Sequence, residues 1–362
     1  MQRNTLSINL IVMLTIAAFA AHFATPAEAW VYGGYWNSNS KTLRAASGTF
    51  PPGDPFRTAL SVVVNTRFYN NPSEFYFSIQ WGDSSVGVDN GQSEVWASSN
   101  SAYDPAICIR QYSWWYNNRI VEADVIFFSG VNWSAGMNRT SLTTYGGSLR
   151  PFRTTCMHEI GHAAGLNHEN DEYNIMGQDW DHIHLNGNTA RCYLGEDASD
   201  GLIGIYGRAS GGSFEDVSVS AFEYSGASGE YSTHGWCDMT NSSNGALSWF
   251  WNDGMKTYRV NRGQTVRVEF TYENNGETTQ NSVPVGYYIS GNSTISTGDT
   301  LIATRSINLG RADVSTNFYT VTIPSNLTRN QYYWLGVIVD RTNVIAETDG
   351  NNNYAYQKIY IN

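Results

Sequence analysis

Three histidines and one glutamate fall within a short segment whose spacing suits a shared metal ion. The segment reads HEIGHAAGLNH from His158 to His168 and fits H-E-x-x-H-x-x-G-x-x-H at every fixed position. On a helix, His158 and His162 lie one turn apart on the same face, so their rings can bind one ion together. The whole chain has only seven histidines, and three of them lie in this segment. The grouping therefore predicts a metal site, and the alternative is an ordinary amphipathic helix.

The chemistry that this pattern indicates is zinc-dependent hydrolysis. Gly165 is the expected end of the helix, because glycine enters the left-handed conformation cheaply, and the following turn can bring in His168 as a third ligand. Three imidazoles leave the fourth position of a tetrahedral zinc ion to water. Glu159 follows the first ligand and is the expected general base, which takes a proton from that water.

The motif resembles that of the metzincin clan of zinc endopeptidases, whose members carry a methionine in a turn below the metal. Here the turn is Asn174 to Gly177, and Met176 follows His168 by eight residues. That spacing is similar to the matrixin branch, although Gln178 stands where a proline often follows the turn. The resemblance implies an α+β catalytic domain over residues 30–208, with a twisted mixed sheet, a zinc-binding helix and a C-terminal helix.

Periodicity and turn signals place the elements of this domain. Helices are expected at residues 56–69, 152–166 and 198–207. Strands are expected at residues 75–80, 93–97, 107–116 and 119–128. The aromatic run Tyr112 to Tyr116 is predicted to belong to the core or the sheet surface, with sugar stacking as the alternative. Residues 139–145 are either an edge strand that binds an extended peptide or an irregular loop.

Further metal sites stay open from sequence. Residues 129–150 contain no histidine and no aspartate, so the structural zinc that many matrixins bind there is expected to be missing. Asp171 and Glu172 are candidate calcium ligands, and a solvated acidic loop is the alternative. His182 and His184, separated by one residue, either bind another metal or line the cleft or its rim.

The first residues indicate export. Residues 1–29 read as a secretory signal, because Arg3 precedes an apolar stretch and Ala27 to Ala29 forms a small-x-small cleavage site. No later stretch approaches the roughly 20 apolar residues of a membrane span. The net charge of −11 argues against nucleic acid and anionic membranes as partners. We therefore expect a secreted protein, extracellular or, in a Gram-negative host, periplasmic or on the cell surface.

Four cysteines are expected to form disulfides in an exported protein: Cys108, Cys156, Cys192 and Cys237. They allow three pairings, and the sequence does not choose among them. Cys156 lies roughly 200° around the helix from His158 and so points away from the metal. We favour a bond from Cys156 to Cys108 or Cys192.

The pattern changes beyond a Gly/Ser-rich linker at residues 209–213, where short strand-like runs alternate with turns, as is typical of a β-sandwich. The runs are residues 217–224, 265–272, 283–289, 318–323 and 332–339. The closing part, from Trp334 to Asn353, resembles CARDB-type bacterial domains, which have an Ig-like antiparallel fold and are thought to serve adhesion or spacing. The resemblance covers residues 214–362. Its Asp/Asn-rich stretch at 340–353 is a candidate calcium site or a set of turn formers.

Two functions are consistent with these observations. In the first, the protein is a secreted zinc endopeptidase with Glu159 as its base. Its partners are then a protein or peptide substrate and, through residues 214–362, a cell-surface or extracellular polymer. In the second, it is a secreted adhesion or binding protein whose metzincin-like domain is inert. A broken HExxH motif would be the mark of the second, so the intact motif favours the first.

Overall fold

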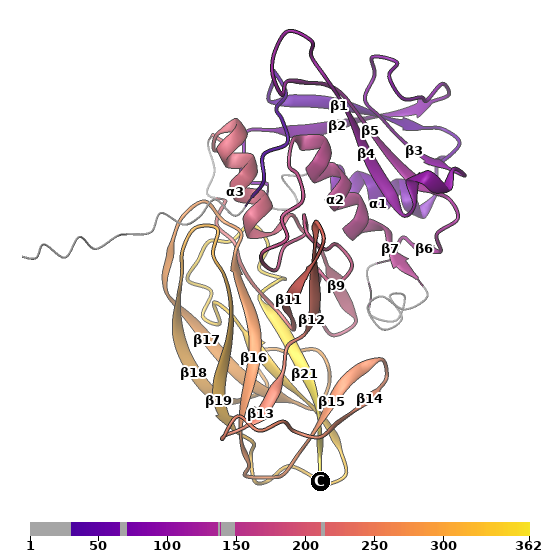
Figure 1. Cartoon of the computed structure of the whole chain (residues 1–362). Coiled ribbons are helices and arrows are strands. Elements are labelled where there is room, and N and C mark those ends of the chain that lie inside the picture. Colours follow the sequence, from indigo (N-terminus) through magenta and orange to yellow (C-terminus); the bar gives the residue numbers. More distant parts are fainter. Residues whose placement is uncertain (1–29, 66–70, 137, 139–148, 211–213) are drawn as a thin grey trace, which may run out of the picture.

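The structure is a computed structural model of the chain, and it describes residues 30–65, 71–136, 138, 149–210 and 214–362. An N-terminal part of mixed helix and strand lies against a C-terminal β-sandwich (Figure 1). The expected signal sequence at 1–29, the expected edge strand at 139–145 and residues 211–213 of the expected linker lie outside the described residues. No described helix is long and apolar enough to span a bilayer.

The N-terminal part contains a five-stranded mixed sheet with strand order β2-β1-β3-β5-β4. The strands are β1 (Ser40–Ala46), β2 (Tyr76–Asp83), β3 (Glu94–Ser98), β4 (Ala106–Tyr112) and β5 (Ile120–Phe128). β4 runs antiparallel to β5, and the other pairs are parallel. β4 is therefore an edge strand, with one side of its backbone available to a partner. The expected strand at 119–128 is confirmed, and the apolar stretch from Val125 to Phe127 is buried as anticipated, whereas Val121 is exposed.

Three α-helices accompany this sheet: α1 (Pro55–Val64), α2 (Phe152–Ala164) and α3 (Gly195–Tyr206). α1 begins where the Asp54 side chain accepts a hydrogen bond from the Phe56 N–H at 2.7 Å, with Pro55 at its first position. α1 ends at Val64, earlier than the expected helix at 56–69. α2 is the expected zinc-binding helix. It is buried on nearly every side between α1 and the sheet.

Short strands complete the N-terminal part. They are β6 (Trp133–Ser134) with β7 (Arg150–Pro151), and β8 (His184–Asn186) with β9 (Thr189–Arg191). A 3₁₀ turn, η1, spans Ser101–Tyr103. β7 leads directly into α2, so a strand pair anchors the start of the helix that contains His158 and His162.

Two sheets share one core in the C-terminal part. The first contains β10 (Val217–Ser220), β16 (Thr265–Asn274), β13 (Met239–Asn241) and β19 (Val314–Thr322). The second contains, in order, β14 (Trp249–Asn252), β15 (Met255–Val260), β21 (Tyr354–Ile361), β20 (Tyr332–Ile338), β17 (Gln280–Ser290) and β18 (Thr300–Leu309). The expectation of a purely antiparallel sandwich is wrong at one place, because β15 and β21 pair in parallel.

A separate hairpin, β11 (Phe222–Ser228) and β12 (Tyr231–Trp236), extends from this sandwich toward α2 (Figure 1). The expected strand at 217–224 is thus two strands that are separated at Ala221. A third apolar cluster joins the two parts, since Tyr173, Ile183 and Leu185 are buried with Phe222 and other sandwich residues. The N-terminal part and the sandwich therefore pack through apolar side chains as well as following one another in sequence.

Two local expectations are wrong. Trp114 and Trp115 are 99% and 90% exposed, because β4 ends at Tyr112 and the following residues form a turn away from the core and the sheet surface. The disulfides are absent as well, since all four cysteines are free thiols. Burial raises the pKa of Cys156 well above its ordinary value and that of Cys192 to about 12. The reactive thiolate is correspondingly rare.

Candidate metal centre

α2 brings the first two histidines of the motif together, and the turn after it adds the third. The Nε2 atoms of His158 and His162 are 3.1 Å apart, and that of His168 lies 3.1 Å from the first and 3.0 Å from the second. The three rings therefore meet at one point, as the spacing predicts. No other three His, Cys, Asp or Glu side chains in the described residues converge in this way except one group at the sandwich.

The second ring nitrogens explain why the Nε2 atoms converge. The Nδ1 atoms of His158 and His162 lie 2.6 Å and 2.8 Å from the carbonyl oxygens of Ile175 and Leu166. A carbonyl oxygen only accepts, so each Nδ1 carries the proton and each neutral Nε2 presents a lone pair. Two such lone pairs and the Nε2 of His168 repel one another at 3 Å unless a cation lies between them. The donor set thus fits a zinc ion.

Gly165 ends α2 in the left-handed conformation, at φ 113°, as the sequence predicts. A Cβ at this position would lie 2.2 Å from the Gly34 carbonyl oxygen, so both the backbone angle and the close approach require glycine. The Gly165 carbonyl accepts from the N–H groups of Gly33 and Gly34 at 2.8 Å and 3.0 Å. The N-terminal segment thereby braces the turn that carries His168.

The three histidines lie in a cleft of about 710 Å³ that Glu159 also lines. Glu159 is buried, and burial raises its pKa to about 8, with the Asp179 carboxylate acting in the same direction and Arg150 opposing them. A dication at the neighbouring Nε2 atoms would favour the ionised form, which is the form that accepts a proton. Residues 105–108 and Arg110 of the β4 edge form another wall of this cleft.

Met176 lies under the ligand-bearing helix, where the sequence places it. It is buried, and a Cβ at Gly161 would come within 2.3 Å of its Sδ. The turn holds its shape because the Asn174 side chain accepts from the Gly177 N–H at 2.7 Å. Ile175 directly precedes Met176, and its carbonyl oxygen accepts the hydrogen bond that orients the His158 ring. The turn therefore supports one metal ligand by hydrogen bonding and the helix by packing.

A buried ion pair connects three segments around the cleft. Arg150 of β7 contacts Asp179 at 2.7 Å. The Thr155 hydroxyl of α2 donates to the same carboxylate. Asp179 follows the methionine turn, so this network joins the entry to α2 with that turn. The pair has little exposed surface, and its charge contributes to the electrostatic environment of Glu159.

Two residues of this site were not predicted from the sequence. Glu230 and Tyr231 lie at the tip of the β11–β12 hairpin and line the cleft. The Tyr231 ring packs against the His168 ring with centroids 4.4 Å apart, and the Glu230 carboxylate is 3.5 Å from His168 Nδ1. The hairpin tip is held there by Asn170, whose amide donates to the Gly229 carbonyl at 2.8 Å. No local sequence pattern predicts these contacts, because Glu230 and Tyr231 follow the expected linker and are distant in sequence from the three histidines.

The remaining candidate residues lie elsewhere. His182 and His184 are fully buried against the sandwich and outside the cleft lining, so the expectation that they line the cleft or its rim is wrong. Burial raises the pKa of Glu172 to about 7, and the calcium role of Asp171 and Glu172 stays a prediction. Asp340 accepts from the N–H groups of Val344 and Ile345 at 3.0 Å and 2.9 Å, as a turn former does.

Comparison with known proteins identifies one part of the chain. The CARDB family model matches residues 252–357, inside the range where the sequence resembles that family. No curated protein matches the chain. The CARDB domain of a Pyrococcus furiosus protein, solved in complex with di-metal ions, is 17% identical, with 41% of this chain and 90% of that chain covered and a TM-score of 0.26.

Two other solved structures are similar at a lower level. OgpA from Akkermansia muciniphila, solved in a catalytically inactive form with an O-glycopeptide substrate, is 9% identical, with 91% of this chain and 92% of that chain covered and a TM-score of 0.22. A chitin binding domain from Burkholderia pseudomallei is 14% identical, with 29% of this chain and 57% of that chain covered and a TM-score of 0.17. These likenesses are too low to assign a fold or an activity. The chain contains a CARDB domain at residues 252–357.

Proposed function

We propose that this protein is an exported zinc-dependent endopeptidase with a metzincin-type, matrixin-like catalytic part. One observation carries the proposal: the three Nε2 atoms of His158, His162 and His168 lie within 3.1 Å of one another, with Glu159 in the same cleft. Bound there, zinc would supply a Lewis acid for the peptide carbonyl and lower the pKa of a water molecule. Met176 supports the helix that bears the ligands.

The residues of the chain have separable roles in this hydrolysis. Glu159 accepts a proton from the attacking water as the water oxygen adds to the carbonyl carbon. It then donates that proton to the amide nitrogen as the C–N bond breaks, which leaves a carboxylate and an amine. The burial of Glu159 keeps the proton from exchanging freely with solvent while the intermediate exists. Ile175, Leu166 and Glu230 hold the imidazole rings in place through their Nδ1 atoms.

The substrate is proposed to bind as an extended peptide along β4. This strand is one of the two edges of the sheet, and it lines the cleft with residues 106–108 and Arg110. A peptide added there would hydrogen-bond through its backbone, and pockets beside the strand would select side chains. β4 takes the place that the sequence assigned to residues 139–145, which lie outside the described residues.

Glu159→Gln tests the catalytic proposal. Glutamine preserves the shape of the side chain but cannot act as a base, so the variant should bind zinc like the wild type and lose turnover by about 10²-fold or more. Zinc content by atomic emission and cleavage of a casein-derived peptide measure the two effects. Glu172→Gln, outside the cleft lining, is the matched control and should keep its activity. Undiminished cleavage by a pure Glu159→Gln preparation would refute the proposal.

The second candidate function is adhesion or binding by an inert protein, and the CARDB domain is the observation that favours it. Such a domain is proposed here to attach the enzyme to a cell surface or extracellular polymer, or to space it from one. A casein zymogram with and without a chelator separates the alternatives. Chelator-sensitive clearing supports the endopeptidase, whereas absence of clearing by zinc-loaded folded protein favours the binding protein.

A further inference from the structure

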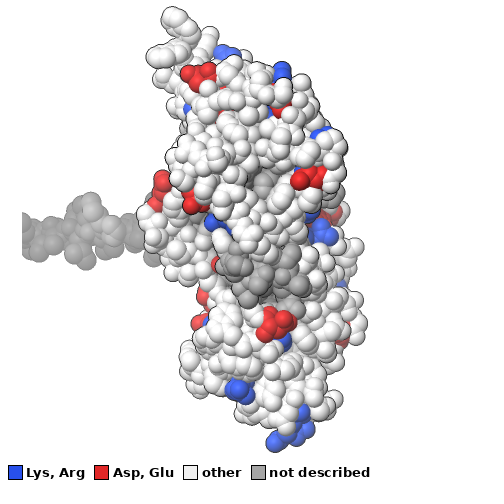
Figure 2. Space-filling model, turned by 90° about the vertical axis from the view of Figure 1, so that its right-hand side faces the viewer, with Lys and Arg blue, Asp and Glu red and all other residues white. Residues whose placement is uncertain are grey.

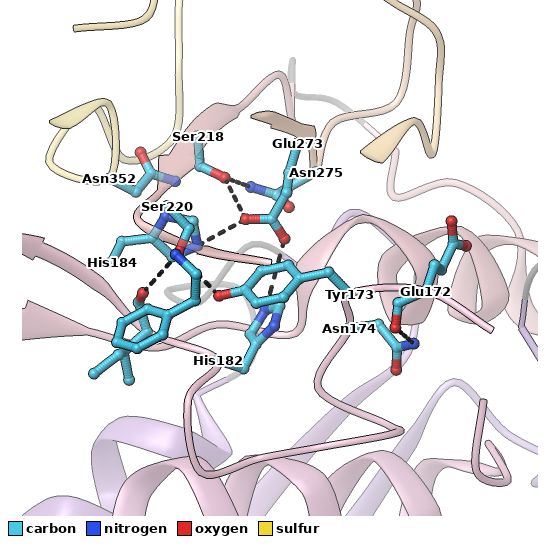
Figure 3. A network of polar contacts seen from close by, with 12 residues as sticks. Glu172, Tyr173, Asn174, His182, His184, Ser218, Ser220, Glu273, Asn275 and Asn352 are labelled. Carbon is cyan, nitrogen blue, oxygen red and sulfur yellow. Dashed lines mark hydrogen bonds and ion pairs between the residues drawn. The ribbon is translucent and has the colours of Figure 1, made fainter. Parts of the chain in front are cut away.

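Two histidines and two glutamates meet in the interior where the N-terminal part packs on the sandwich. We call these four residues the interface cluster: His182, His184, Glu196 and Glu273. His184 begins β8, Glu196 lies in the first turn of α3, and Glu273 lies on β16. Figure 3 shows both imidazoles directed at the Glu273 carboxylate. Each of the four side chains is at most 1% exposed.

Hydrogen bonding fixes which nitrogen His184 presents to the cluster. Its Nδ1 lies 2.7 Å from the Val219 carbonyl oxygen, which only accepts, so Nδ1 carries the proton. The Nε2 of a neutral ring then presents a lone pair, and this atom is 2.8 Å from Glu273 Oε2. The Nε2 of His182 is 3.7 Å from Glu273 Oε1. A nitrogen lone pair and a carboxylate oxygen repel each other at these distances. A cation bound between the two Nε2 atoms and the Glu273 carboxylate would attract both.

Several buried polar atoms of the cluster are unsatisfied. Both ring nitrogens of His182 and the Oε1 atom of Glu273 have no hydrogen-bond partner among the described residues, and the Glu196 carboxyl group interacts with that of Glu273 alone within the cluster. Glu273 Oε2, by contrast, accepts from the Ser218 hydroxyl at 3.0 Å. An unpaired buried polar atom costs about 1–3 kcal/mol. A single ion bound by these groups would satisfy most of them at once.

The space between the ligands suits one small ion. Ligand atoms from His182, His184 and Glu273 all lie within 4.8 Å of one another, and two donors on a tetrahedral zinc ion are about 3.3 Å apart. A Cβ at Gly195 would lie 3.0 Å from His182 Nε2 and 3.7 Å from Glu273 Oε1. Gly195, at φ +82°, therefore leaves just enough room for the cluster, and Glu196 directly follows it.

We propose that the interface cluster is a second divalent-metal site, of the zinc type, with His182, His184 and Glu273 as its protein ligands and the Glu196 carboxyl group beside Glu273. All three ligands are fully buried, so a substrate cannot reach the ion, and the site is structural, not catalytic. Two ligands belong to the N-terminal part and Glu273 to the sandwich. The ion thereby cross-links the two parts and stabilises their packing. This site is separate from His158, His162 and His168 and does not depend on the proposed protease activity.

The test uses the full mature chain with the first site disabled. The double variant His158→Ala/His162→Ala should retain about one equivalent of zinc after exhaustive dialysis, measured by inductively coupled plasma mass spectrometry, against about two in the wild type. Adding His184→Ala should reduce the retained metal to near zero. In the double variant, cobalt should give the visible absorption of a tetrahedral site, and a strong chelator should lower the thermal midpoint.

His234→Gln is the matched control in the same background. His234 is a partly buried histidine, with its ring 6.3 Å from that of His182, and it is outside the cluster, so its substitution should leave about one equivalent bound. Glu273→Gln replaces His184→Ala if the latter fails to fold by circular dichroism. A folded double variant without metal, or a triple variant that keeps it, overturns the proposal. So does anomalous scattering from the zinc-loaded wild type with a peak only at the three histidines.

Discussion

The turn of α2 between His158 and His162 has no room for a side chain at Gly161. A Cβ there would lie 2.3 Å from Met176 Sδ, and Met176 is itself buried under the helix. We expect Gly161→Ala to weaken zinc binding, because the helix or the methionine turn must move, and to introduce overpacking of about 1–3 kcal/mol. Metal titration and denaturant unfolding measure these effects.

Met176→Ala provides the background that isolates this contact. It vacates the space that the new methyl group would occupy, so Gly161→Ala should no longer weaken zinc binding there. The helix propensity of alanine, about 1 kcal/mol better than that of glycine, should then make the substitution neutral or stabilising. Equal losses in both backgrounds would show that the two residues do not couple through this packing.

Asp124 on β5 makes a residue-scale prediction about pH. Its carboxyl group has no exposed surface, and burial raises its pKa to about 8, with Glu122 acting in the same direction. In an unfolded chain the pKa is about 3.9. Between these values the folded protein binds a proton that the unfolded chain lacks. Stability should therefore fall as the pH rises from about 4 to about 8.

Asp124→Asn tests this assignment. The amide oxygen can still accept the hydrogen bond that Asp124 Oδ1 receives from the Glu94 N–H at 3.1 Å, but the side chain has no proton to lose. Thermal midpoints measured with zinc in excess should decline less steeply with pH in the variant than in the wild type. Parallel pH profiles of the two proteins would assign the decline to other buried carboxyl groups.

The β11–β12 hairpin is the element whose role in the site was least expected. Its tip brings Tyr231 onto the His168 ring and Glu230 near its Nδ1. Groups that orient a metal ligand typically contribute about 10-fold to 100-fold in affinity. Tyr231→Ala should weaken zinc binding by about 10-fold and reduce kcat/KM. Glu230→Gln should have a smaller effect, because that carboxylate is largely exposed.

Ser228→Ala is the control on the same hairpin. Ser228 is exposed, and its position is paired with Tyr231 across the strands. Its substitution should therefore change neither zinc affinity nor kcat/KM. Chelator competition gives the affinities, and peptide cleavage at saturating zinc gives the rates. If Tyr231→Ala behaves like Ser228→Ala, the hairpin covers the site without supporting it.

The contrast between α2 and this hairpin shows what the sequence could predict. His158, His162 and Gly165 are local signals, because helix periodicity and the glycine end determine where the two rings point. Glu230 and Tyr231 reach the site through tertiary packing, which leaves no periodic mark on residues 222–236. The tryptophans after β4 were misplaced for a related reason: apolar composition indicates burial on average, and the turn at residues 113–119 overrides it.

At the scale of the whole molecule, charged residues are sparse, at 15% of the chain. The net charge is −11, and on the face in Figure 2 the described acidic and basic residues are scattered. Apolar packing between the two parts is the stronger feature. Tyr173, Ile183 and Leu185 are buried with sandwich residues. The expected boundary at 209–213 therefore separates two sequence patterns, but not two independent surfaces.

This packing predicts that the N-terminal part is not stable alone. A chain of residues 30–208 would expose Tyr173, Ile183 and Leu185, which are at most 7% exposed in the full chain. It would also lack Tyr231, which contacts His168. We expect this fragment to aggregate, or to unfold at a lower temperature and bind zinc more weakly. Residues 214–362 retain their own core and should fold separately.

Gel filtration, circular dichroism and zinc titration of both fragments and of residues 30–362 measure these outcomes. A full chain with a Gly/Ser insertion at residues 209–213 is the control. Lengthening a linker costs little, so activity should persist if the packed interface, and not the linker, holds the two parts together. A monomeric 30–208 fragment with the thermal midpoint and kcat/KM of the full chain would mean that the sandwich contributes nothing to the site. The contacts from Tyr231 and Glu273 would then be incidental to both proposed metal sites.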